Sequence, residues 1–408
     1  MIYPDNDKPI QAIRKKRVNE ILPKLMNELG ISMWLVFTRE GSRDPVGMDI
    51  GAERVVARGA FIFSLKSGEF SKVAIVASYD ATPVAESGIY DEIITYKDEG
   101  IGPHLKETVK KLNPRRIGLN FSRDIPMADG LSYGMRKYLE EILGLRYAKR
   151  FVSAEDLVVS FRSRKLDEEI KIIEKAVSLT QKIINETLSS RHIKAGETTE
   201  KHLSKILKRK TREAGAEVSF ASITTGPTRG HSEPTDRVIE RGDLIRVDFG
   251  IKYKGYFTDI QRTAYMLKHD ENSPSKFIQK MWDINLKANR LAVSAMKPGV
   301  RGIDVDAKAR FVLKRSGFNE YPHSSGHPIG YSVHDAGPIL GPDWKERYGK
   351  SVFFKLQEGQ VFAVEPIVYA YYPETDEEIN IGLEENVVVD STGARYLGKP
   401  QMELILIR

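Results

Sequence analysis

VDFGIKYKGYFTDI, residues Val247–Ile260, has the pattern of a β-hairpin. Apolar and aromatic residues fill both arms, and Lys254-Gly255 provides a turn near the middle. Each arm nevertheless carries one carboxylate, Asp248 or Asp259, among residues that are expected to pack. Asp is a poor strand former, and it is costly to bury unless it is paired or bound to a metal.

The hairpin predicts that Asp248 and Asp259 lie nearly opposite each other. Side chains that are opposite across antiparallel strands have Cβ atoms ~4.5–5.5 Å apart. Two carboxylates this close repel each other unless a proton or a cation lies between them. Taken alone, the stretch allows two interpretations: acidic residues at a surface turn, or a metal site.

The composition is that of a globular protein with two domains. A chain of 408 residues is too long for one ordinary core, and its 41% hydrophobic and 29% charged residues are ordinary proportions. The net charge of +7 is small for this length. Short basic runs at 15–17 and 208–210 lie in amphipathic helical patterns, so we expect solvated helix faces and no nucleic-acid partner.

Cysteine is absent, which excludes disulfides, thiolate metal sites and cysteine nucleophiles. The first residues have no apolar signal region, and no uninterrupted apolar run approaches the ~18 residues of a membrane span. These features predict a cytoplasmic protein that has no membrane partner.

Two domains are predicted, at residues 1–160 and 161–408. The first alternates amphipathic helical segments with short β-rich runs such as MWLVF and KVAIVAS, which is typical of an α/β layer. In the second, strand pairs alternate with predicted helices, so we expect an α+β domain. These helices are predicted near 166–188, 199–214, 275–296 and 303–316.

Further candidate metal ligands lie in the second domain. The segment PHSSGHPIGYSVHDAG contains His323, His327 and His334, and glycines flank His327. Glu365 lies in the apolar run VFAVEPIVY, which predicts a buried position within a strand. Glu384 and Glu385 stand at the head of another strand, where we expect Glu385 to face solvent.

Two Asp, two Glu and one His offer mainly oxygen ligands. Such a set favours Mn²⁺, with Zn²⁺, Co²⁺ or Fe²⁺ as alternatives. Four carboxylates can hold two divalent ions, which together can activate a water for hydrolysis. On this hypothesis, a metal offsets the burial of Asp248 and Asp259.

The ordered set His, Asp, Asp, Gly-His, Glu-Pro, Glu resembles the pita-bread metallopeptidases: methionine aminopeptidase, prolidase and aminopeptidase P. The resemblance covers residues 165–408. The N-terminal half is similar in size and α/β pattern to the creatinase-type domain of prolidases and aminopeptidases P. The resemblance therefore implies an α+β pita-bread catalytic domain preceded by a smaller α/β creatinase-type domain.

Roles can be carried over by position. The resemblance implies His231 and His334 as catalytic residues, Glu365 as the acceptor of a proton from the attacking water, and His323 and Tyr369 as substrate-binding residues. It also implies a homodimer. The implied ligands of two divalent ions are Asp248, Asp259, His327, Glu365 and Glu384.

The predicted function is dinuclear metal-dependent hydrolysis of the Xaa-Pro bond of dipeptides or short peptides. One alternative is a non-proline aminopeptidase or another small-amide hydrolase on the same site. Another is a non-catalytic binding protein on a peptidase fold.

Several positions depart from the family pattern and leave the substrate preference open. Pro328 follows the ligand His, Gln261 replaces Thr, and Gly382 stands where prolidases and aminopeptidases P have Arg. Extra residues precede Glu365, including GPDWKERYGKS, in which Lys345 or Arg347 is a candidate substitute for the missing cation.

Overall fold

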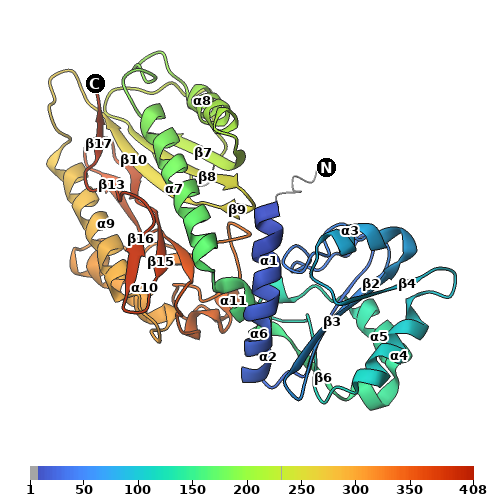
Figure 1. Ribbon diagram of the computed structural model, residues 1–408. Helices are drawn as coiled ribbons and strands as arrows, with labels where there is room; N and C mark the ends of the chain where they lie inside the picture. Colours follow the sequence, from blue (N-terminus) through green and yellow to red (C-terminus); the bar gives the residue numbers. More distant parts are fainter. Residues whose placement is uncertain (1–7, 231) are drawn as a thin grey trace. The chain divides into compact units, whose positions relative to one another are not determined.

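The computed structural model describes residues 8–230 and 232–408 (Figure 1). The chain divides into two compact units, Met1–Arg162 and Ser163–Arg408. No helix in the described ranges combines the length and the apolar character that a membrane span requires.

The first unit is built on a six-stranded mixed sheet with the order β4-β3-β2-β1-β5-β6. Its central strands β1, β2 and β3 are antiparallel, whereas β4, β5 and β6 each run parallel to a neighbour. The strands are β1 (Met33–Thr38), β2 (Gly59–Lys66), β3 (Glu69–Ala77), β4 (Glu92–Tyr96), β5 (Ile117–Leu119) and β6 (Phe151–Ser153). The interleaved strands confirm the predicted α/β layer.

Helices α4 and α5 bury their apolar stripes against this sheet, where Leu105 and Leu139 join Leu35, Ile62 and Ile75 in one core. Each fully buried side chain of this kind contributes roughly 1.5–3 kcal/mol. The helices of this part of the chain are α1 (Lys8–Glu20), α2 (Leu22–Glu28), η1 (Ser78–Asp80), α3 (Ala81–Glu86), α4 (Ile101–Leu112), η2 (Pro126–Ala128), α5 (Tyr133–Ala148) and α6 (Glu155–Ser163).

The described residues of the second unit form three sheets, with the orders β17-β10-β8-β7, β11-β12-β15-β16 and β13-β14, and β9 pairs with β8. Strand β17 is parallel to β10, and the other pairs are antiparallel. The strands are β7 (Glu217–Thr225), β8 (Leu244–Tyr253), β9 (Tyr256–Phe257), β10 (Ile260–Met266), β11 (Gly326–Pro328), β12 (Val361–Val364), β13 (Ile367–Tyr372), β14 (Glu377–Gly382), β15 (Glu385–Val389), β16 (Ala394–Tyr396) and β17 (Ile405–Ile407).

Helices α9 and α10 lie side by side in this unit (Figure 1). Trp282 of α9 and Leu313 of α10 are buried in one core with Phe362 and Val387 of the strands. The four helices predicted from periodicity are confirmed as α7 (Asp167–Thr187), α8 (Glu200–Glu213), α9 (Lys276–Ala295) and α10 (Gly302–Arg315), and the short α11 (Lys345–Tyr348) and η3 (Ser351–Phe353) follow.

The predicted hairpin forms, with its turn at Lys254-Gly255. Both residues have positive φ, 47° and 80°, as a two-residue type I′ turn requires. Strand β8 pairs with β9 through Tyr253 and Tyr256, and further along with β10. This turn therefore sets the register of the strands that carry the two aspartates.

The register corrects the predicted position of the two carboxylates. Asp248 is paired with Gln261, so Asp259 lies diagonally across from Asp248, not directly opposite it. Residues 259 and 261 have the same parity, and the two aspartates consequently face the same side of the sheet. Val247, Phe249 and Ile260 are fully buried. Because a shift of one residue would turn these side chains to the opposite face of the sheet, their burial stabilises this register.

Candidate metal centre

A pocket of about 600 Å³ in the second unit collects the predicted ligands. Its lining includes all five of them, which come from β8, from the segment before β10, from β11, from the residue after β12 and from the residue before β15. The structure thus brings together residues that are far apart in the sequence: Asp248, Asp259, His327, Glu365 and Glu384.

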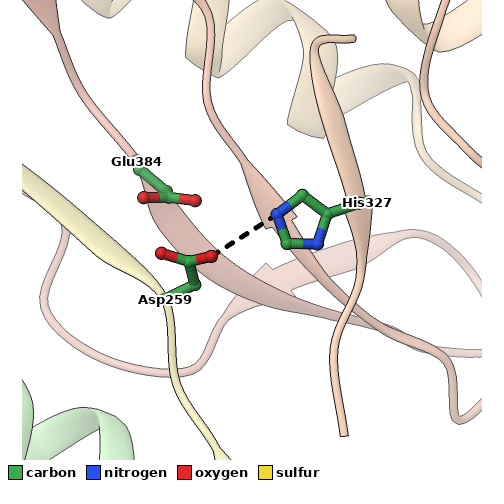
Figure 2. Close-up of side chains that lie close together, drawn as sticks. All are labelled: Asp259, His327 and Glu384. Atoms are coloured by element: carbon green, nitrogen blue, oxygen red, sulfur yellow. Dashed lines mark ion pairs between the residues drawn. The ribbon is translucent and has the colours of Figure 1, made fainter. Parts of the chain in front are cut away.

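Three of these side chains form a tight group (Figure 2). One ligand atom from each of Asp259, His327 and Glu384 lies within 4.8 Å of the others. His327 Nε2 is 3.4 Å from Asp259 Oδ2, as the dashed line shows. All three residues are buried, and such a set of donors can hold a metal ion.

Glu365 and Asp248 line the same pocket. Glu365 Oε1 is 3.8 Å from His327 Nε2, and the Glu365 side chain is 21% exposed. Glu365 was expected at a buried position within a strand, but it is partly exposed and β12 ends at Val364. The N–H of Glu365 donates to Ser325 O at 2.8 Å. The following Pro366 has no N–H and cannot donate a hydrogen bond to a neighbouring strand. The strand is therefore interrupted where the Glu365 carboxylate enters the pocket.

The orientation of His327 suits a metal ligand. Its Nδ1 lies 3.2 Å from the carbonyl oxygen of Pro328, while its Nε2 faces the carboxylates. A ring nitrogen that donates to a carbonyl oxygen leaves the other nitrogen free to accept or to bind a metal. Pro328, a departure from the family pattern, is thus compatible with the site because only its carbonyl group is used.

The site carries an excess of negative charge. Burial raises the pKa of Glu384 well above its ordinary value, and the nearby Asp259, Asp248 and Glu365 raise it further. Burial lowers the pKa of His327, but Asp259 and Glu365 outweigh this effect and bring it to about 9. One imidazole cannot balance four carboxylates, so the donor set fits divalent cations.

Glu385 corrects the sequence prediction. It was expected to face solvent, but it is 1% exposed and Arg262 Nη2 lies 2.9 Å from its Oε2. Its Oε1 accepts a hydrogen bond from the N–H of Gln401 at 2.8 Å. Glu384 faces the pocket, and Glu385 belongs to a buried ion pair with Arg262, so neither glutamate faces bulk solvent.

Of the other predicted site residues, His334 and His323 line the pocket. The rings of His334 and His327 have centroids 4.3 Å apart. His323 Nδ1 lies 2.7 Å from Ser324 O. Tyr369 packs against the core, outside the lining of this pocket. His231 lies outside the described residues.

Comparison with known proteins agrees with this geometry. The sequence model of Metallopeptidase family M24 matches residues 171–391, more than half of the chain. This chain belongs to metallopeptidase family M24. It is therefore a peptidase with the pita-bread fold, and membership of the family implies divalent metal ions.

Individual relatives of this M24 peptidase carry more specific names. Xaa-Pro dipeptidase of Pyrococcus furiosus is 30% identical over 279 residues, covering 67% of this chain and 73% of that protein. Xaa-Pro dipeptidase of Pyrococcus horikoshii is 28% identical over 303 residues, covering 73% and 80%. The crystal structure of X-Pro aminopeptidase from Thermotoga maritima matches with a TM-score of 0.72 and 26% identity, covering 94% of this chain and 99% of that one.

The pocket of this M24 peptidase also contains residues that the sequence did not single out. Ser222 and Glu233 line it, and no local motif marks either residue. Between the two candidate cations, the structure places Arg347 in the lining and Lys345 outside it. The Arg347 guanidinium donates to Pro322 O at 2.6 Å and lies over the ring of Tyr348.

Proposed function

We propose that this chain hydrolyses the Xaa-Pro bond of dipeptides and short peptides with two divalent ions. The observation that carries the proposal is the convergence of five ligand-type residues on one pocket. The proposed ligands are Asp248, Asp259, His327, Glu365 and Glu384. The names of the Pyrococcus relatives support the choice of substrate.

When bound, the two ions would supply Lewis acids that activate a water and polarise the scissile carbonyl. Glu365 accepts the proton of that water, since its carboxylate faces the pocket and is the more exposed of the two Glu ligands. His334 donates to the substrate amide and stabilises its developing charge. His231 shares this role on the basis of the family resemblance.

Recognition of proline rests on packing. A proline after the scissile bond has no N–H, so the enzyme cannot select it through a hydrogen bond at that nitrogen. Phe220, Val333 and Ile339 provide apolar lining for a ring. Arg347 is a cation in the described lining, and its planar guanidinium can bind the carboxylate of a short peptide with two parallel hydrogen bonds.

Three finer points belong to this proposal. Mn²⁺ is the proposed ion because oxygen donors dominate the ligand set. The cytoplasmic location rests on the cysteine-free composition. The homodimer rests on the family resemblance.

The test is a substrate panel assayed after chelation and return of Mn²⁺, Zn²⁺ or Co²⁺. We expect Xaa-Pro and Xaa-Pro-Xaa peptides to be cleaved at least ~100-fold better than matched Xaa-Ala peptides, a discrimination of about 2.7 kcal/mol at ~1.36 kcal/mol per decade. Equal cleavage of both sets would favour the non-proline aminopeptidase. Protein that binds no metal and cleaves neither set would favour a binding protein.

A further inference from the structure

Side chains complete the hydrogen bonding of the backbone just before β10, near the metal centre. In an antiparallel pair, the peptide groups of alternate residues face toward and away from the partner strand. Thr258 N–H donates to Ile251 O of β8 at 3.0 Å, so the peptide groups of the next residue, Asp259, face away from β8. Strand β17 pairs with β10 only from Ala264 onward. The peptide groups of Asp259 therefore need another partner.

Asn386 of β15 is that partner. Its Nδ2 donates to Asp259 O at 2.5 Å, and its Oδ1 accepts from Asp259 N–H at 3.2 Å. A carboxamide has the same donor and acceptor as a peptide group. Asn386 is 1% exposed, and both of these side-chain hydrogen bonds are made to the backbone of one proposed metal ligand.

The same segment carries the opposing ligand. Glu384 lies two residues before Asn386, and its N–H donates to Gln261 O at 3.2 Å. Arg262 Nη1 donates to Glu384 O at 2.8 Å. Residues 382–386 thus run antiparallel beside residues 259–263, and most of the contacts between the two segments involve side chains.

We propose that Asn386 is a positioning residue that holds Asp259 at the correct distance from Glu384 for metal binding. The inference rests on the ligand assignment in the proposed function. Asp259 lies between β9 and β10, outside regular strand, so its carboxylate position depends on how its own peptide groups are held. Loss of the carboxamide lets the Asp259 backbone move and lowers metal affinity, although no ligand atom has been removed.

The test compares Mn²⁺ affinity by competition with a chelating dye, in wild type and in Asn386→Leu. Loss of a group that orients a ligand typically lowers metal affinity ~10–100-fold, and we expect that range. Asn386→Ala, which cannot overpack, is measured in parallel in case the leucine variant fails to fold. Thermal unfolding of the metal-free proteins separates a loss of affinity from a loss of fold.

Asn285→Leu is the matched control. Asn285 lies fully buried on α9, and its side chain makes no hydrogen bond among the described residues. We expect this variant to bind Mn²⁺ like the wild type. Wild-type affinity in the Asn386 variants, or an equal loss in the control, would overturn the inference. A wild type that binds Mn²⁺ but does not cleave Xaa-Pro peptides would refute the proposed function and leave the inference about metal affinity standing.

Discussion

Arg262→Met should destabilise the second unit strongly. Arg262 and Glu385 form an ion pair at 2.9 Å, with side chains only 2% and 1% exposed. Removing one partner of a buried pair leaves an uncompensated charge and costs ~3–5 kcal/mol. For a unit of this size, each kcal/mol lowers the melting temperature by roughly 2–4 °C, which gives a loss of roughly 6–20 °C.

The loss should depend on pH. Burial raises the pKa of Glu385, and the charge of Arg262 opposes that effect, so the pKa rises further in the variant. A carboxyl group whose folded pKa exceeds its unfolded value of ~4.3 destabilises the fold at high pH. This penalty shrinks as the pH falls through the folded pKa. We therefore expect a larger defect at pH ~8 than at pH ~5.

The assay is thermal unfolding of metal-free protein, so that a change in metal binding does not contribute to the melting temperature. Glu385→Gln combined with Arg262→Met should recover more than half of the lost stability, because the uncompensated charge of Glu385 is then removed. Arg301→Met is the control, since the Arg301–Asp304 pair is 48% and 46% exposed and such pairs contribute ~0–1 kcal/mol. A melting temperature for Arg262→Met within ~2 °C of wild type, or no lower than that of the control, would refute the reasoning.

Three further variants test the site. Asp259→Ala should lose at least one ion and nearly all turnover, because Asp259 belongs to the buried ligand group; wild-type metal content by elemental analysis would contradict the assignment. His334→Ala should lower kcat by ~10²–10⁴-fold with metal content unchanged, whereas metal loss would make it a ligand. A Cβ at Gly382 would lie 1.5 Å from Gln261 Oε1, so Gly382→Ala must displace that carboxamide. We expect Gly382→Ala and Gln261→Ala to change kcat/KM to the same extent, and the double variant to show no larger change than either. Additive effects on kcat/KM would contradict a coupling between Gly382 and Gln261.

Local patterns were sufficient for the elements and for the type of site. Lys254-Gly255 predicted the hairpin turn correctly because the conformation of a two-residue turn depends on its own residues. Helix α10 was predicted near 303–316 and ends at Arg315, and Gly317 follows with φ of 79°, a conformation that glycine adopts readily at a helix end. Metal ligands could be proposed because Asp248, Asp259 and Glu365 are carboxylates within apolar sequence, where only a strong partner makes burial favourable.

Contacts between distant segments settled what these patterns left open. Glu384 and Glu385 are chemically alike and adjacent, and only the position of Arg262 on β10 explains why Glu385 is buried in an ion pair. Arg347 and Lys345 were equal candidates until the fold placed Arg347 in the pocket lining. Asn386 carries no sequence signal at all, because its role depends on the unpaired edge of a strand that lies far away in the sequence. Propensity and periodicity depend on neighbours along the chain, whereas the surroundings of a side chain in a folded core come from segments that the chain brings together only when it folds.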